Sequence, residues 1–425
     1  MPADALLRYQ HGLLERMLRH ARADVPAYAT RLDAVFDGEN RFLVERWRDL
    51  PLLNKTDISR DNDSFQPPAI PPELQPVIRN QTMGTTGTPL SIPRTRLSLV
   101  VAACFVERRS RWHDIDSSLP LGMIRFVSGT EADFPEGSSQ KGWSPAHPDA
   151  DIHTLSVRAS VEEQIDWLRR RQPAYLQLYP SVAAEIAARI GEDSAALGIR
   201  KIFTFGETVS DDQRAIVKSA LGADLIDTYS ASEVGTIAVQ CPASDTYHVM
   251  AEGNFLELLD DAGAPVEPGN PARVVVTPIY NTAMPLVRYD IGDFAEAIEG
   301  PCPCGLTLPR LRRIMGRSRQ MFRFADGSVR WPNVHTGDLT AIVPLREFQF
   351  VQHSATDIEL RFERIAGNAD VVDRDALSDL VRRDLHPGVS IRVSELETIP
   401  RAPGGKFERY LSHVGAGLPA PDSSG

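Results

Sequence analysis

The segment "QTMGTTGTP" at residues 81–89 combines glycines and hydroxyl side chains in a pattern suited to binding an anion. Backbone N–H groups of a glycine-rich turn form a concave site for phosphate, and threonine hydroxyls add further donors. The residues that would do so are Thr82, Gly84, Thr85, Thr86, Gly87 and Thr88. A surface loop is the alternative, and the segment lacks the lysine with which the common nucleotide P-loop ends. It predicts a phosphate site whose positive charge comes from elsewhere.

Lysine is rare in this chain, because only Lys55, Lys141, Lys201, Lys218 and Lys406 occur among 46 basic residues. Lys406 follows "PRAPGG", a turn whose two glycines can adopt unusual backbone dihedral angles. A compact ammonium on a flexible stem reaches positions where a planar guanidinium would be too bulky. A solvated surface lysine is the alternative. Lys406 is therefore the candidate for the charge that the glycine-threonine loop lacks.

Three of the four cysteines lie in the second half of the chain, beside prolines and a glycine. Cys302 and Cys304 form a Cys-x-Cys pair, and His248 follows Cys241 after six intervening residues. Three thiolates and one imidazole make a closed tetrahedral set for zinc, which replaces core packing in a loop-rich segment. Unligated buried thiols and a surface histidine are the alternative. We expect these four residues to form one structural zinc site.

Further short motifs follow the loop in a fixed order. They are "FGE" at 205–207, "YSASEVG" at 229–235, "PLVRYDIGDF" at 285–294, "IMGRSRQMF" at 314–322 and "IPRAPGGKFER" at 399–409. With the loop, they resemble the motifs of the adenylate-forming superfamily of acyl-coenzyme A ligases. "LPLLNKTDI" and "PCPCG" resemble the phenylacetate-coenzyme A ligases and capsule-synthesis proteins of that superfamily. The resemblance extends over about residues 5–412 and depends on the ordered set, because each motif alone is common.

The resemblance implies an enzyme that joins a carboxylic acid to ATP, releases pyrophosphate and passes the acyl group to a thiol, usually that of coenzyme A. The threonines and glycines of residues 82–88 would hold the β- and γ-phosphates. Glu233 would be catalytic through magnesium, a hard cation that prefers carboxylate and phosphate oxygens. A solvated glutamate after a strand is the alternative for Glu233. Lys406 would contact the attacking carboxylate and the α-phosphate.

The resemblance also implies further contacts to the nucleotide. These would come from Gly206, Glu207, Tyr229, Ser230, Asp293 and Arg317. Tyr229 would lie against adenine, opposite the backbone of residues 206–207, and Asp293 would accept hydrogen bonds from both ribose hydroxyls. Arg317 would contact the ribose or the α-phosphate. Half-buried strand packing for Tyr229 and turn-capping surface charges for the other two are the alternatives.

The chain departs from the superfamily pattern at three positions. Thr88 stands where many relatives have lysine, and Ile291 precedes Gly292 and Asp293 where threonine is usual. Arg319 occupies the hinge about which the small domain of relatives swings between the two half-reactions, where aspartate is usual. A hinge needs tolerant backbone dihedral angles more than one particular side chain. Arginine is acceptable there, but its presence leaves open whether the second half-reaction proceeds as it does in relatives.

Three functional hypotheses follow. The first is an ATP-dependent ligase acting on an aryl or small organic acid, with coenzyme A as acceptor. The second is an enzyme of the same fold that passes the acyl group to an amine or a carrier protein. The third is an inactive nucleotide-binding scaffold, against which the joint presence of Glu233, Asp293, Arg317 and Lys406 argues. The acid would lie between residues 123–129, residues 179–181 and Phe205.

The pattern of apolar residues and capping motifs predicts an α/β fold. Between residues 120 and 230, strand-like and helix-like segments alternate in a βαβαβ rhythm, which implies a mainly parallel sheet with crossover helices. Ser160 with Glu163, and Ser210 with Gln213, form capping boxes that begin two of the helices. Residues 254–298 contain strands joined by turns. After about residue 318, two strands, a helix and a strand suit a small α+β domain.

These elements predict two domains, because 425 residues exceed one ordinary core. Residues 1–316 would form an N-terminal adenylation domain that binds ATP and acid, and residues 317–425 a small mobile C-terminal domain. The net charge of −11 argues against a nucleic-acid partner, which needs a basic face. The absence of a long apolar run argues against a membrane protein and favours a cytoplasmic one. A homodimer is expected only by analogy with relatives.

Overall fold

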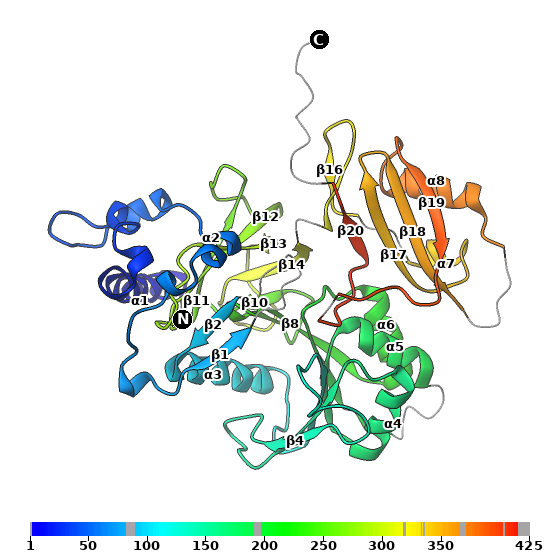
Figure 1. Ribbon diagram of the computed structural model, residues 1–425, viewed down its shortest axis with the longest axis horizontal. Coiled ribbons are helices and arrows are strands. Elements are labelled where there is room, and N and C mark those ends of the chain that lie inside the picture. Colours follow the sequence, from blue (N-terminus) through cyan, green and yellow to red (C-terminus); the bar gives the residue numbers. More distant parts are fainter. Residues whose placement is uncertain are drawn as a thin grey trace, which may run out of the picture. The chain divides into compact units, whose positions relative to one another are not determined.

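A computed structural model describes residues 2–81, 90–190, 197–317, 320–332, 334, 336–365, 371–402 and 404–414. The chain divides into two compact units, Met1–Met315 and Gly316–Gly425, each built around a sheet of its own (Figure 1). The glycine-threonine loop and Arg319 lie outside the described residues. Within the described ranges, no helix is both long and apolar enough to cross a bilayer.

A mixed sheet of twelve strands organises the first unit, in the order β11-β12-β13-β14-β10-β9-β8-β7-β6-β3-β5-β4. The strands are β3 (Leu121–Arg125), β4 (Ser138–Lys141), β5 (Asp151–Ser156), β6 (Tyr175–Leu178), β7 (Lys201–Phe205), β8 (Asp224–Ala231), β9 (Gly235–Gln240), β10 (Tyr247–Val249), β11 (Asn254–Leu259), β12 (Pro271–Pro278), β13 (Tyr289–Ile298) and β14 (Arg310–Arg317). The run β5-β3-β6-β7-β8 is parallel. On both sides of it, strands pair antiparallel. The predicted α/β class is confirmed, with the parallel part at the centre of a mixed sheet.

The crossover helices begin where the sequence predicts them. The Ser160 and Ser210 capping boxes both form, at the starts of α4 (Val161–Arg171) and α6 (Asp211–Leu221). In each box, the serine side chain accepts from a backbone N–H of the first helical turn, and the Glu163 or Gln213 side chain accepts from the serine N–H. Between them, α5 (Pro180–Ile190) follows β6 directly. These helices return the chain so that β3, β6, β7 and β8 all end at the same edge of the sheet.

The parallel strands are buried on both faces. Leu176 and Ile202 pack with apolar residues of α4, α5 and α6 in one core. The neighbouring residues Tyr175 and Phe203 point to the opposite face and pack there with Val106 of α3 (Arg96–Trp112). Figure 1 shows α4, α5 and α6 grouped together and α3 apart from them. Alternation of side chains along each strand explains why these strands are apolar throughout.

The N-terminal segment packs against the antiparallel part of the sheet. Helix α1 (Ala3–Asp24) buries its apolar stripe in a core shared with β12 and β13. After short turns of 3-10 helix, the chain reaches Leu53, just before α2 (Lys55–Arg60). Leu53 N–H donates to the Arg288 carbonyl at 2.9 Å, and its own carbonyl accepts from Asp290 N–H at 2.8 Å. This pairing anchors the start of β13, the strand that carries Asp293.

A two-stranded hairpin carries the segments on either side of the glycine-threonine loop. Strands β1 (Ile78–Gln81) and β2 (Ser91–Arg94) pair antiparallel. Directly after β2, the Thr95 side chain accepts a hydrogen bond from Ser98 N–H and caps α3. The sequence prediction did not include this hairpin, because both strands are only four residues long and polar.

The second unit contains a four-stranded sheet in the order β19-β18-β17-β20. Its elements are β15 (Phe322–Arg323), β16 (Val329–Arg330), α7 (Thr336–Thr340), β17 (Leu345–Ser354), β18 (Asp357–Arg364), α8 (Arg374–Asp384), β19 (Ser390–Glu395) and β20 (Tyr410–Ser412). Strands β17, β18 and β19 and helix α8 fall where the sequence predicts them. Strand β20 was missed. Its parallel pairing with β17 fixes the chain that follows the "PRAPGGK" turn.

Candidate active site

The end of β8 lies where the parallel part of the sheet meets the antiparallel part. Strand β8 pairs in parallel with β7 and antiparallel with β9. Tyr229, near its end, is 7% exposed, and its hydroxyl donates to Asp293 Oδ2 at 2.9 Å. Open α/β sheets bind ligands at the carboxyl ends of their strands and at topological switch points. The fold thus joins, at such a point, two residues separated by 64 positions in the sequence.

The connection between β8 and β9 carries Glu233. The pairing of the two strands shifts between Tyr229 and Ser230, so the backbone is irregular where it enters this turn. The Glu233 side chain is 9% exposed, and it makes no hydrogen bond or ion pair with any residue that the structure describes. The carboxylate is therefore not engaged by any described residue, as a metal ligand requires.

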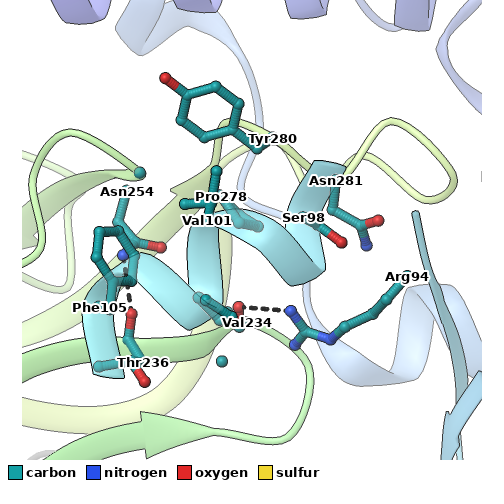
Figure 2. A pocket seen from close by; sticks show the side chains of 13 residues that line it. Arg94, Ser98, Val101, Phe105, Val234, Thr236, Asn254, Pro278, Tyr280 and Asn281 are labelled. Carbon is teal, nitrogen blue, oxygen red and sulfur yellow. Dashed lines mark hydrogen bonds between the residues drawn. The ribbon is translucent and has the colours of Figure 1, made fainter. Parts of the chain in front are cut away.

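An arginine that none of the sequence motifs contains lies beside the Glu233 turn. Arg94, the last residue of β2, is 7% exposed, and its guanidinium donates from Nη1 to the Val234 carbonyl at 3.1 Å and from Nη2 to the Ser232 carbonyl at 3.2 Å. Figure 2 shows the guanidinium directed at Val234. Burial lowers the pKa of Arg94, and the charge of Glu233 opposes that effect. No sequence signal singled it out, because arginine is the common basic residue of this chain.

A small cavity adjoins the Arg94 guanidinium (Figure 2). Its walls include Ser98, Phe105, Tyr280 and Asn281, and it offers about 30 Å³ of water-accessible space. That volume corresponds to about one or two water molecules. The cavity is therefore too small to be the ATP site or the acid site.

The three segments predicted to enclose the acid lie together at the ends of β3, β6 and β7. The rings of Tyr179 and Phe205 are 5.0 Å apart between centroids. Burial and the charge of Glu207 raise the pKa of Tyr179 to about 12, although a hydrogen bond with the Phe126 backbone opposes the rise. Ser181 N–H and Oγ donate to the two carboxylate oxygens of Glu207, at 3.0 and 3.1 Å. The Glu207 side chain thus caps α5, while Gly206 adopts a left-handed backbone with φ of 77°.

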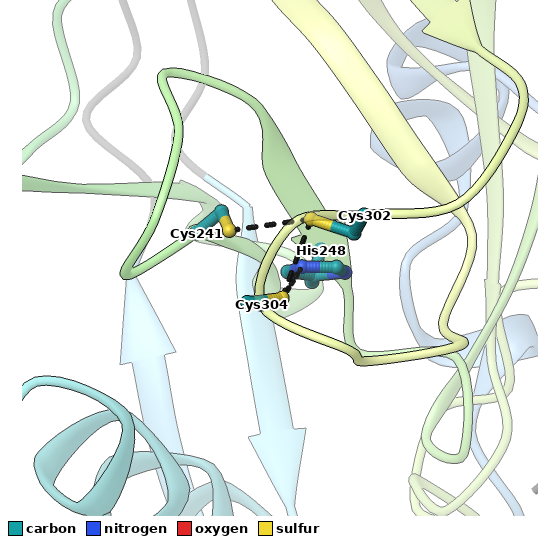
Figure 3. A group of neighbouring side chains, drawn as sticks. All are labelled: Cys241, His248, Cys302 and Cys304. Atoms are coloured by element: carbon teal, nitrogen blue, oxygen red, sulfur yellow. Dashed lines mark hydrogen bonds between the residues drawn. The ribbon is translucent and has the colours of Figure 1, made fainter.

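The three cysteines and the histidine predicted to bind zinc lie together (Figure 3). Cys302 Sγ is 3.5 Å from Cys241 Sγ and 3.3 Å from Cys304 Sγ, and His248 Nε2 is 3.2 Å from Cys304 Sγ. The four ligand atoms all lie within 4.8 Å of one another. Burial lowers the pKa of His248, which favours the neutral ring that binds metals. The remaining cysteine, Cys104, is exposed on α3.

The other predicted site residues belong to the second unit. Arg317 is the last residue of β14, and its N–H donates to the Gln320 side-chain oxygen at 3.0 Å. Lys406 is half-buried, and its carbonyl accepts from Ala402 N–H at 3.0 Å. Gly405, before it, has φ of 77°, the left-handed conformation for which the glycines of this turn were expected. Thr82, Gly84, Thr85, Thr86, Gly87 and Thr88 lie outside the described residues.

Comparison with known proteins agrees with the resemblance. The phenylacetate-coenzyme A ligase of Thermus thermophilus is 26% identical over 97% of both chains, and that of Escherichia coli is 27% identical over 75% of this chain and 72% of its own length. The solved structure of a 2-hydroxyisobutyryl-CoA ligase complexed with 2-HIB-AMP is similar in fold, with a TM-score of 0.78, 21% identity and coverage of 97% of this chain and 90% of that one. The chain matches no family model.

The fold and the ordered motifs define an adenylate-forming enzyme. A large α/β unit carries the Tyr229, Glu233 and Asp293 motifs, and a small α+β unit carries the lysine motif. Within that superfamily, the chain is similar to phenylacetate-coenzyme A ligases of three bacteria.

Proposed function

We propose that the protein is an ATP-dependent carboxylic acid ligase that forms an acyl-adenylate and then an acyl-coenzyme A thioester. The observation that carries this proposal is the hydrogen bond between Tyr229 and Asp293, which unites two motifs of the superfamily at the switch point of the sheet. The full-length similarity to a phenylacetate-coenzyme A ligase supports the same activity.

The reaction requires positioning and charge neutralisation more than covalent chemistry from the protein. A carboxylate oxygen attacks the α-phosphorus of ATP, and the bond to pyrophosphate breaks. A thiolate then attacks the acyl carbon, and AMP leaves. Tyr229 and Asp293 would orient the adenosine, and Lys406 would stabilise the charge that develops between the carboxylate and the α-phosphate.

Magnesium fits the environment of Glu233. Glu233 is 9% exposed and makes no hydrogen bond or ion pair with a described residue, so its carboxylate oxygens can coordinate a hard cation. The ion would neutralise phosphate charge when it is bound with ATP. The residues at 82–88 would complete the phosphate contacts, as the resemblance implies.

We assign the acid site to the side chains around Tyr179 and Phe205. An aromatic pair beside Glu207 favours an aryl or small organic acid that lies against the rings, with its carboxylate directed to the nucleotide. The relatives are named for phenylacetate and 2-hydroxyisobutyrate, which are an aryl acid and a small acid respectively.

The cysteine-histidine group fits zinc. A tetrahedral zinc ion with Zn–S bonds of about 2.3 Å separates its sulfur ligands by roughly 3.8 Å. The Sγ–Sγ distances of 3.3 and 3.5 Å are shorter than that value by about half an ångström or less. They are too long for a disulfide bond, which measures about 2.05 Å. We therefore propose a structural zinc ion held by Cys241, His248, Cys302 and Cys304.

We further assign adenylation to the unit that ends at Met315 and a mobile role to the unit that begins at Gly316. The names of the relatives favour coenzyme A over an amine or a carrier protein as acceptor, and they do not favour an inactive scaffold. A homodimer and a cytoplasmic location stay predictions.

The test is pyrophosphate release across a panel of aryl and small organic acids, with and without coenzyme A. The proposal expects release that depends on the acid, and thioester product when coenzyme A is present. Acid-dependent release whose adenylate is never transferred to coenzyme A would instead favour an amine or carrier acceptor. No release with any acid would favour the inactive scaffold.

A further inference from the structure

We propose that Arg94 is a positioning residue that holds Glu233 ready to bind the metal–ATP complex. This inference rests on the proposed function of Glu233 as the metal ligand. It adds a residue that none of the motifs contains, because Arg94 lies in β2, outside the segment 229–235 that carries Glu233.

The contacts of Arg94 fix the turn on both sides of Glu233. Nη1 donates to the carbonyl of Val234, and Nη2 donates to the carbonyl of Ser232, so one rigid fork holds the residue before and the residue after the carboxylate. Gly235 has φ of 94°, and a Cβ atom there would lie 3.2 Å from Nη1. The turn is thus shaped closely around the guanidinium (Figure 2).

The groups that accept hydrogen bonds from Arg94 determine whether the Glu233 oxygens are available to a metal ion. If Arg94 formed a direct ion pair with Glu233, it would occupy the oxygens that a magnesium ion needs. Instead its Nη atoms donate to backbone carbonyls, and no hydrogen bond to Glu233 occurs among the described residues. Its charge still acts on the carboxylate through space. Arg94 therefore orients the turn that carries Glu233 without competing for the carboxylate oxygens.

Hydrogen bonds hold the backbone on both sides of Arg94, so the position of its Cα atom is fixed. The Asn281 side chain donates to the carbonyl of Pro93 at 3.0 Å, and Thr95 caps α3 on the other side. If Arg94 has only a structural role, its replacement should lower the free energy of unfolding and leave metal affinity unchanged. If Arg94 positions Glu233, its replacement should also weaken metal binding, and this difference can be measured.

The experiment titrates Mn²⁺ into the full-length protein in the presence of saturating ATP and follows bound Mn²⁺ by electron paramagnetic resonance. It needs no knowledge of the acid. The variants are Arg94→Gln, Arg94→Lys, Glu233→Gln and the double variant Arg94→Gln/Glu233→Gln. Arg214→Gln is the matched control, because Arg214 also donates to a backbone carbonyl, that of Leu225, in the same unit. Thermal unfolding of each variant is measured in parallel.

We expect Arg94→Gln to weaken Mn²⁺ binding about tenfold or more, as is typical when a residue that orients a metal ligand is lost. Arg94→Lys should recover part of the loss, because it restores the charge and one of the two hydrogen bonds. The double variant should bind no more weakly than Glu233→Gln, and Arg214→Gln should bind as the wild type does.

Two results would overturn the inference alone. One is Arg94→Gln binding Mn²⁺ as the wild type does, whatever its thermal stability. The other is additive loss in the double variant, which would show that Arg94 acts independently of Glu233. Wild-type protein that binds no Mn²⁺ with ATP would instead overturn the metal role of Glu233, and the inference with it.

Discussion

The Tyr229 hydroxyl donates a hydrogen bond to Asp293 Oδ2 at 2.9 Å, although 64 positions separate the two residues in the sequence. The resemblance assigns Tyr229 to adenine and Asp293 to ribose. The hydrogen bond would link these two roles physically, because the residue assigned to the base also orients the carboxylate assigned to the sugar. Asp293 lies in β13, and Leu53 anchors the start of this strand through hydrogen bonds with the backbone of Arg288 and Asp290.

Replacement of Asp293 should raise the ATP requirement without unfolding the protein. Asp293→Ala removes the acceptor for two ribose hydroxyls, and each hydrogen bond to a charged group contributes about 1.5–3 kcal/mol. We expect the KM for ATP to rise by roughly tenfold to a hundredfold, measured by acid-dependent pyrophosphate release. Tyr229→Phe, which deletes only the neutral hydroxyl, should have a smaller effect. An unchanged ATP dependence of Asp293→Ala would mean that the ribose is bound elsewhere.

Lys406 should matter for the first half-reaction alone. Lys406→Ala should lose on the order of a hundredfold or more in adenylate formation, because a preorganised charge is removed. The same variant, supplied with presynthesised acyl-adenylate, should keep most of its transfer to coenzyme A if, as we propose, the small unit swings away before the thiol attacks. Lys218→Ala is the control, because Lys218 is an exposed lysine paired with Asp224. Equal loss in both half-reactions would contradict the swing, and no loss in either would contradict a catalytic role.

The zinc content of cysteine variants should distinguish the three clustered cysteines from Cys104. Protein purified without chelator should contain about one equivalent of zinc per chain, as expected for a closed tetrahedral site. Cys302→Ser should lose the zinc and lower the thermal unfolding midpoint, because structural zinc contributes folding free energy. Cys104→Ser should keep the zinc, since Cys104 lies on α3 and is not one of the four clustered ligands. A zinc content well under one equivalent per chain in the wild type would contradict the zinc site.

The stability of the second unit should decrease in acid through Glu359. Burial raises the pKa of Glu359, but hydrogen bonds from Ser394, His353 and Arg361 outweigh burial and lower the pKa from 4.5 to about 2. The ionised form is thus favoured in the folded state, and its stabilising contribution is present above pH 4.5 and lost as the pH falls to about 2.

Glu359→Gln should therefore be less resistant to urea than the wild type at pH 6, and the difference should shrink as the pH falls through this window. Hydrogen–deuterium exchange of β17 and β18 at graded urea concentrations measures this in the full-length chain. The exposed Glu397→Gln serves as control and should track the wild type at both ends of the range. A difference that is the same at pH 6 and pH 2 would exclude the ionisation of Glu359 as its cause.

Local patterns predicted much of the fold. The Ser160 and Ser210 capping boxes located two helix starts to the residue, because the capping interaction involves neighbours in the sequence. Strand β20 was missed, since three residues beside a glycine-rich turn carry no period of their own, and their pairing with β17 is set by tertiary contacts.

The site was less accessible to sequence reasoning. Motif order indicated Tyr229 and Asp293, and spacing indicated the cysteine-histidine group, because residue type carries the chemistry in both cases. Arg94 could not be found in this way. Its role depends on its burial and on the direction of its guanidinium toward two carbonyls of a distant turn. The residues next to Arg94 in the sequence predict neither property.

The change of strand direction at β8 has a consequence for how such enzymes diversify. The side chains assigned to the acid follow β3, β6 and β7, on the parallel side of β8, whereas Asp293 lies in β13, on the antiparallel side. Exchanging the residues that follow those parallel strands leaves the β13 scaffold untouched. On the proposed assignment, changes in the residues that follow β3 and β6 can therefore alter acid preference while the contact between Tyr229 and Asp293 stays in place.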